Sequence, residues 1–304
     1  MLITDKIGYS NLNPYPSVTN NNLMTRKLKD KLANLDFRHS SVEEIEKIFS
    51  KEILGHTRPT INISPDGLFR ARIITNTKED DLQTTKSIWY PNFREIDQKY
   101  HQLNRCSDIG QNFFYSSNYL EAVIKELNPK NGDLIIIGIF HKKFPETKIR
   151  SQYAGIEALK TNPKENSELK GYKYISESDK IIEEYVSSKF QDKVAEGEEY
   201  KYKPSIAFSN ILLKNECIDC LIYPSVASDL KSVNYGIKAN FVDKFLYCQS
   251  TYIYTIKKSG NEFELIPNKY GKRIVFDKKD AKNSIIEWKE NKASEKQQTI
   301  KYCL

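Results

Sequence analysis

The stretch FFYSSNYLEAVIKEL, residues 113–127, changes its period halfway along and decides the fold prediction. Its aromatic start, 113–116, is typical of a short strand. Asn118 is a favourable residue for opening a helix, and Glu121 stands at the third helical position. The apolar stripe of that helix consists of Leu120, Val123, Ile124 and Leu127. The sequence therefore predicts a strand that leads directly into an amphipathic helix.

Outward from this stretch, helical and extended patterns are mixed. Strands are predicted at 68–74, 133–140, 221–223, 241–247, 251–257, 263–266 and 273–276, and helices at 23–35, 41–53, 177–194, 204–213 and 283–292. Ser41 and Glu44 have the spacing of a capping box for the second of these helices. The polar stretch at 145–175 is predicted to be a loop or insertion. Because βαβ units do not alternate regularly, the pattern favours an α+β fold over a doubly wound sheet.

Composition and charge restrict the class of protein. The 304-residue chain carries a net charge of +7, mostly from lysines interleaved with acids. This pattern contains no basic stripe with aromatics between, so we expect no nucleic-acid partner. It stays compatible with an anionic small ligand or an acidic protein. The first ten residues lack a long apolar segment, and the apolar run at 134–140 is too short to span a bilayer. We therefore expect a cytoplasmic protein without membrane contact.

The cysteines argue against a disulfide framework and against a metal site. Their number is odd, five, in a chain without an apparent export signal, which favours free thiols. Cys217 and Cys220 form a single Cys-x-x-Cys pair. Neither a second pair nor a nearby histidine completes four ligands. We therefore predict no metal, and at least one of the two thiols is expected to pack in the core.

Four residues suit a pocket for a phosphate-rich, sugar-containing ligand. Arg105 precedes Tyr115 by ten residues, Tyr115 precedes Glu126 by eleven, and Ser225 follows a short apolar run. A guanidinium matches phosphate oxygens, and a carboxylate can bind sugar hydroxyls. On a helix, Glu126 falls roughly 120° from the centre of the apolar stripe, at its edge. Taken singly, each residue would fit an ordinary packing or surface role as well.

The local sequences around these residues resemble the RES family, which is named for an arginine, a glutamate and a serine. The matching segments are Asn104-Arg105…Gly110…Phe114-Tyr115…Ala122…Glu126 and Tyr223-Pro224-Ser225…Val233-Asn234. The resemblance extends over about 68–246. It implies an ADP-ribosyltransferase-like fold of mixed sheets with a central cleft, here preceded by N-terminal helices. Characterised members are mostly NAD-consuming toxins of bacterial toxin–antitoxin pairs.

The resemblance also implies roles for individual residues. Glu126, Arg105 and Ser225 would be catalytic: the carboxylate would stabilise a ribosyl cation, the guanidinium would hold the pyrophosphate, and the hydroxyl would orient the sugar. The implied substrate-binding residues are Tyr115, near the nicotinamide, Arg70 and Arg72, near the adenylate phosphates, and Asn234, which would brace its loop. By this resemblance the chain divides into an arm and helical extension at 1–60, a catalytic domain at 61–250, and strands with a helix at 251–304 packed on the same domain.

The activity implied is cleavage of the nicotinamide–ribose bond of NAD, by hydrolysis or phosphorolysis. NAD would be the substrate, with no resident cofactor, and a separate antitoxin or inhibitor protein would block the cleft. A homo-oligomer is left open. Two alternatives remain at this point. One is an ADP-ribosyltransferase that modifies a protein, and the other is a non-catalytic NAD- or nucleotide-binding subunit of a defence complex.

Overall fold

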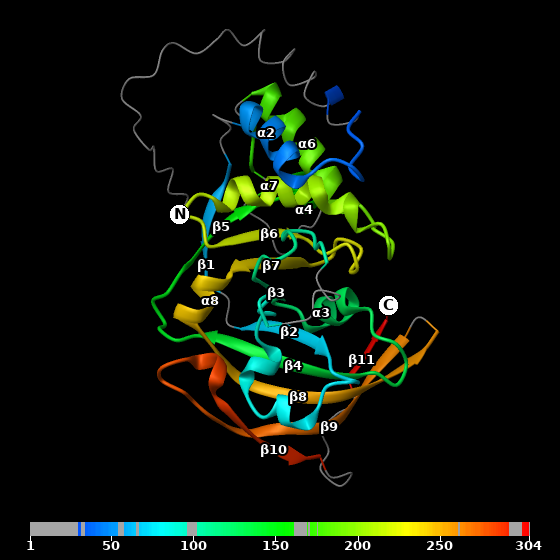
Figure 1. Cartoon of the computed structure of the whole chain (residues 1–304), viewed down its shortest axis with the longest axis vertical. Helices are drawn as coiled ribbons and strands as arrows, with labels where there is room; N and C mark the ends of the chain where they lie inside the picture. The colour runs from blue at the N-terminus through cyan, green and yellow to red at the C-terminus, as the bar shows by residue number, and fades with distance from the viewer. Residues whose placement is uncertain are drawn as a thin grey trace.

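The computed structural model describes residues 30–31, 34–53, 58–64, 67–95, 102–160, 169, 171–174, 176–260, 262–291 and 300–303. The predicted arm at 1–22 and most of the predicted helix at 23–35 lie outside the described residues. The main helices are α2 (Val42–Ile53), α3 (Leu120–Leu127), α4 (Ile156–Lys160), α6 (Glu177–Gln191), α7 (Lys203–Leu213) and α8 (Ala239–Phe245). In Figure 1, α2, α4, α6 and α7 gather at one end of a long sheet.

The strands of the described chain form a single sheet. They are β1 (Thr60–Ile63), β2 (Leu68–Ile73), β3 (Phe113–Ser117), β4 (Leu134–Lys142), β5 (Ile149–Tyr153), β6 (Cys220–Pro224), β7 (Val233–Lys238), β8 (Leu246–Ser259), β9 (Glu262–Val275), β10 (Ile285–Glu290) and β11 (Ile300–Cys303). Their order is β1-β5-β6-β7-β3-β2-β4-β8-β9-β10, and β11 pairs with β9. β5 and β6 run parallel, whereas the other neighbours are antiparallel. The predicted mixed α and β class is confirmed.

The sheet nearly parts between β2 and β3. These strands are in register only at Phe69 and Ser117, whereas β3 pairs with β7 and β2 with β4 along their lengths. Beyond that single pair the Arg70 side chain bridges the gap, because its Nη1 donates to the Tyr115 carbonyl at 3.0 Å. The family resemblance implied mixed sheets with a central cleft. The structure has one continuous sheet whose central strands diverge instead.

Separate apolar clusters cover the two sides of this opening. Helices α2, α6 and α7 pack together through Phe49, Phe190 and Phe208, whose rings make edge-on contacts. Helix α3 packs mainly on β2, and its fully buried Ile124 belongs to a second cluster that includes Ile135 of β4. Burial of such side chains is the main favourable term in folding. A third cluster, which includes Leu68 of β2 and Phe114 of β3, spans the opening and joins the two sides.

The predicted N-terminal cap is confirmed, whereas the cap of α3 is different. Ser41 Oγ accepts a hydrogen bond from the Glu44 amide at 3.1 Å, and Glu44 Oε2 accepts one from the Ser41 amide at 2.9 Å. This is the reciprocal capping box that the spacing predicted. Helix α3 begins at Leu120, with Tyr119 rather than Asn118 at its N-cap and without a side-chain cap.

Two predicted elements have the opposite secondary structure. The segment predicted as a strand at 241–247 is largely helix α8, in which the rings of Phe241 and Phe245 pack at a tilt of 43° with their centroids 4.8 Å apart, because residues four apart are neighbours on a helix. The helix predicted at 283–292 is strand β10, paired with β9. Its alternation places Ile286 in the core while Ile285 stays 54% exposed, so tertiary pairing overrides the helix propensity of its charged residues.

The predicted loop at 145–175 contains an additional strand and helix. Strand β5 buries Ile149, Ser151 and Tyr153 at alternate positions, and α4 follows immediately. The polar residues of this stretch face outward, which concealed the period of two that marks a half-buried strand.

Candidate functional site

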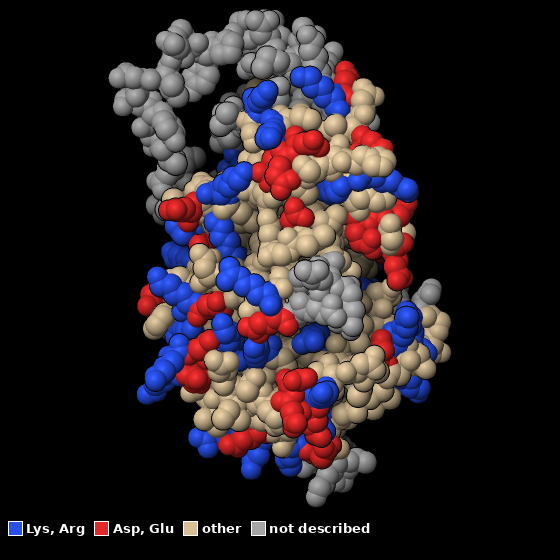
Figure 2. Space-filling model, viewed as in Figure 1, with Lys and Arg blue, Asp and Glu red and all other residues tan. Residues whose placement is uncertain are grey.

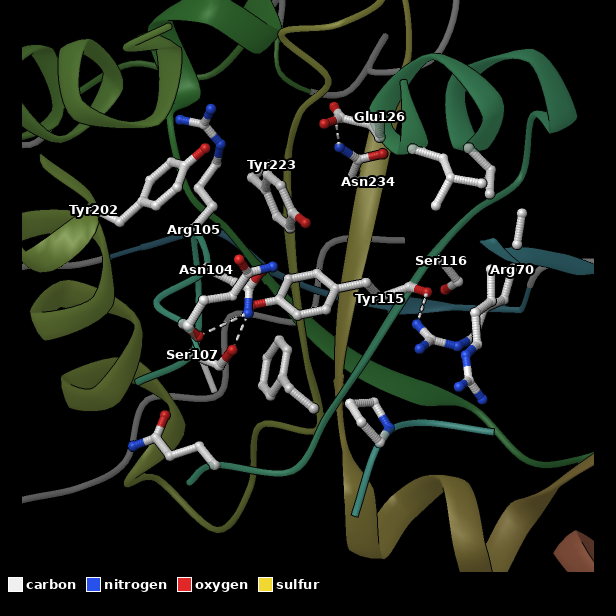
Figure 3. A pocket seen from close by; sticks show the side chains of 18 of the residues that line it. Arg70, Asn104, Arg105, Ser107, Tyr115, Ser116, Glu126, Tyr202, Tyr223 and Asn234 are labelled. Carbon is white, nitrogen blue, oxygen red and sulfur yellow. Dashed lines mark hydrogen bonds between the residues drawn. The ribbon is translucent and has the colours of Figure 1, made fainter. Parts of the chain in front are cut away.

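A cleft of about 500 Å³ lies where β2 and β3 diverge (Figure 3). Helix α3 borders it on one side, and the 3₁₀ turn η4 (Glu199–Tyr202) borders it on the other. Six of the seven residues singled out from the sequence line it: Arg70, Arg72, Arg105, Tyr115, Glu126 and Asn234. The seventh, Ser225, lies just behind the wall and is completely buried. Segments far apart in the sequence thus meet in one cavity.

Glu126 is held by two hydrogen bonds to the same carboxylate oxygen. Ser225 Oγ donates to its Oε1 at 2.7 Å, and Asn234 Nδ2 donates to that atom at 2.8 Å. Ser225 follows the end of β6, and Asn234 lies on the neighbouring β7 opposite Tyr223. The end of this hairpin therefore presents both donors to helix α3. Among the described residues none donates to Oε2, so the second oxygen is left to accept from a ligand.

Arg105 secures the C-terminal end of helix α6. Its Nη1 donates to the Phe190 carbonyl at 2.9 Å, and its Nη2 donates to the Asp192 carbonyl at 3.0 Å. Cations near a helix C-terminus satisfy its unpaired carbonyls and interact favourably with its dipole. The guanidinium also lies over the ring of Tyr202, 5.1 Å from its centroid. Arg105 therefore joins the helical end of the molecule to the cleft.

Tyr115 points into the cleft with its hydroxyl already engaged. Ser107 Oγ lies 2.8 Å from that hydroxyl, and the Cys106 amide donates to it at 3.2 Å. Its neighbour Phe114 faces the opposite side and is completely buried, as strand alternation predicted. Burial raises the pKa of Tyr115 well above its ordinary value, and that of Tyr223 likewise. Both phenols therefore stay neutral over the physiological range.

Arg70 and Arg72 lie on the other side of the opening. Arg70 Nε donates to the Ile88 carbonyl at 3.0 Å, and Arg72 Nη1 donates to the Ser87 carbonyl at 3.2 Å. Burial, followed by the charge of Arg72, lowers the pKa of Arg70 to about 10. Arg70 thus remains a cation at neutral pH. Trp89 and Tyr90, which directly precede Pro91 of the cleft lining, both donate to Asp243.

Several residues that line the cleft were not predicted from the sequence. Tyr202, Tyr223, Ser107 and Ser116 all line the cavity. Tyr223 stood in a quoted motif, directly before Pro224, and that position could have suggested a role. Ser107 is two residues from Arg105. Neither Tyr202 nor Ser116 carried a signal, since only the chain's path brings η4 to the cleft and only the divergence of β2 and β3 uncovers Ser116.

Neither the described thiol pair nor the face seen in Figure 2 shows a further site of this kind. In the described ranges, no three His, Cys, Asp or Glu side chains are grouped so as to hold a metal ion. Cys220 is buried and Cys217 exposed, and both are free thiols. Lysines and acids are interspersed over the face in Figure 2. None of the described helices has the length and apolar character that crossing a membrane requires.

Neither a scan of protein-family models nor a search of curated proteins finds a match to this chain.

Proposed function

We propose that this protein is a RES-type, NAD-consuming enzyme that cleaves the bond between nicotinamide and ribose. The observation that carries the proposal is the Glu126 carboxylate, held in the cleft through one oxygen by Ser225 and Asn234. The proposal is supported by Arg105, which lines the same cleft as Glu126, and by Ser225, which donates to Glu126 from behind the cleft wall. An ADP-ribosyltransferase-like arrangement of the fold is part of the same proposal, supported by the mixed sheet and its central cleft.

The chemistry requires one carboxylate rather than two. When the C1′–N bond breaks, its electron pair leaves with the nicotinamide nitrogen, which becomes neutral and needs no general acid. Positive charge then develops on the ribose, and a carboxylate placed beside it stabilises that state more than the ground state. The free Oε2 of Glu126 would serve there, as glycosidase carboxylates do. A water or phosphate oxygen then forms the new bond to C1′, and a water nucleophile releases its proton to solvent.

The test is nicotinamide release from NAD by the purified protein and by its Glu126→Gln variant, with and without phosphate. The amide keeps a carbonyl oxygen for Ser225 and Asn234, so the fold should survive. We expect release by the wild type and a loss of about 100-fold or more in the variant. Mass analysis separates ADP-ribose from ADP-ribose 1-phosphate and from ADP-ribosylated protein. Full turnover by a folded Glu126→Gln protein would refute the assignment.

A further inference from the structure

One carboxylate of helix α2 is turned inward, against helix α7. The Glu46 side chain is only 12% exposed, although α2 lies at the outer end of the molecule in Figure 1. Its Oε1 accepts a hydrogen bond from Asn210 Nδ2 of α7 at 2.6 Å, and its Oε2 accepts one from Lys214 Nζ at 2.5 Å. Helix α2 lies outside the stretch that resembles the RES family, so the resemblance gives Glu46 no role.

Asn210 extends this contact to the loop at 105–111. Its Oδ1 accepts from Gln111 Nε2 at 3.2 Å, and Gln111 Oε1 accepts from the Asp108 amide at 2.9 Å. A carboxylate paired with a lysine can only accept, so the amide nitrogen of Asn210 must face Glu46 and its oxygen must face Gln111. The side chains of Glu46, Asn210 and Gln111, here called the Glu46 relay, thus join α2 to the loop.

The loop that receives the relay forms part of the cleft wall. The relay residues all line a second cavity beside α2, and Gln111 lines the cleft as well. The Cys106 amide and Ser107 Oγ, which contact the Tyr115 hydroxyl, belong to the same loop (Figure 3). A shift of this loop would therefore move both Gln111 and the partners of Tyr115.

The two ends of the loop are held differently. Ser205 Oγ of α7 donates to the Arg105 carbonyl at 2.8 Å, which anchors the first end. Near the second end Ile109 is 55% exposed. Gly110 has φ +83°, and among the described residues nothing stands within 4 Å of the Cβ that it lacks. Packing therefore restrains this end little, and its orientation depends on the bond from Gln111 to α7.

From this relay we infer that Glu46 is a positioning residue for the cleft, which acts through Asn210 and Gln111 on the loop at 105–111. Resting on the proposed function, the inference gives the N-terminal helix a part in binding NAD. The Glu126 carboxylate is held from the hairpin of β6 and β7 instead. Loss of the relay should therefore raise KM and leave kcat nearly unchanged.

The relay is tested without any ligand, by amide hydrogen exchange of the segment 104–112 followed by mass spectrometry. The variants are Glu46→Ala, Asn210→Ala and Glu46→Gln, of which the last keeps an acceptor oxygen for Asn210 and removes only the charge. The matched control is Lys214→Met. It deletes the other partner of Glu46, a lysine whose side chain is 69% exposed, and leaves the bond to Asn210 intact.

We expect exchange in 104–112 to be about tenfold faster in Glu46→Ala and in Asn210→Ala, because the loop loses a hydrogen bond that orients it. The double variant should be no faster than either single variant, since both break one relay. Glu46→Gln and Lys214→Met should exchange like the wild type.

Three results would overturn the relay: wild-type exchange in both alanine variants, equally faster exchange in β4, or a Glu46→Gln protein that exchanges like Glu46→Ala. The second would show general loosening of the fold, and the third an effect of charge alone. If Glu46→Ala does not fold, Asn210→Ala decides.

Nicotinamide release from NAD is then measured on the same proteins. KM should rise about threefold or more in Glu46→Ala and Asn210→Ala, with kcat within about twofold of the wild type, and Glu46→Gln should restore KM. Faster exchange with a wild-type KM would overturn the positioning role. A wild type that releases no nicotinamide, while exchange changes as expected, would refute the proposed cleavage instead. Calorimetric titration with ADP-ribose then replaces KM, and equal affinity or no binding overturns the positioning role.

Discussion

Asn234 Nδ2 lies 2.8 Å from Glu126 Oε1, although 108 residues separate the two in the chain. The same oxygen accepts the hydroxyl of Ser225. Two hydrogen bonds to one carboxylate oxygen fix the orientation of the Glu126 side chain and leave its other oxygen free. Preorganisation of this kind is what electrostatic stabilisation of a developing charge requires.

Loss of either donor should therefore slow turnover without weakening substrate binding. For Asn234→Ala and Ser225→Ala we expect kcat for nicotinamide release to fall about tenfold each, because a hydrogen bond to a charged group contributes about 1.5–3 kcal/mol. KM should change less. The double variant should lose less than the product of the single losses, since both donors serve one oxygen. A change confined to KM would mean that these side chains bind substrate directly.

Arg105→Met should destabilise the protein even without substrate. The substitution removes the donors to the carbonyls of Phe190 and Asp192 at the end of α6. We expect the free energy of unfolding to drop by about 1–3 kcal/mol in urea denaturation. Lys180→Met, which removes an exposed ion pair with Glu184 on the same helix, is the comparison and should cost under about 0.5 kcal/mol. Equal stability of the two variants would contradict the capping role.

Gly236 should tolerate no side chain. It lies on β7 opposite Tyr115, and an added Cβ would stand only 3.0 Å from Phe113 Cζ and closer still to Cε1. Gly236→Ala should lower the free energy of unfolding by about 1–3 kcal/mol through overpacking, and it should also displace Phe113 from the cleft wall. Gly171→Ala, at a position with open space around it, should be nearly neutral. Differential scanning calorimetry of both variants measures the difference, and an equal Tm for the two would contradict the overpacking at Gly236.

The described cysteines should differ sharply in reactivity. Burial raises the pKa of Cys106 and of Cys248 to about 12, so at pH 8 both remain protonated thiols. Because the thiolate is the reactive form, iodoacetamide should modify exposed Cys217 and spare the buried thiols until denaturant is added. Peptide mass mapping reads each site separately. Rapid labelling of Cys106 in the native protein would show that the cleft wall opens.

The sequence predicted local structure well where a single pattern dominated. The capping box at Ser41 and Glu44 and three of the four predicted core residues of α3 followed from helical spacing, whereas the fourth, Val123, lines the cleft. Failures occurred where long-range pairing outweighed local preference. The residues of β10 have helix propensity, but pairing with the edge of β9 makes them a strand. The polar residues on the outward face of β5 concealed its strand period in the sequence. No local signal could show that α8 interrupts the strands.

For the candidate site, the resemblance to the RES family singled out Arg105, Tyr115, Glu126 and Ser225, because residue types and spacing alone left each of them with an ordinary packing or surface role as well. Only the tertiary structure decided what each one contacts. It turned Arg105 toward a helix end, placed Ser225 behind Glu126, and opened the sheet beside Ser116. The physical reason is that side-chain chemistry is a local property of the sequence, whereas a hydrogen-bond partner or a buried charge exists only once distant segments have packed together.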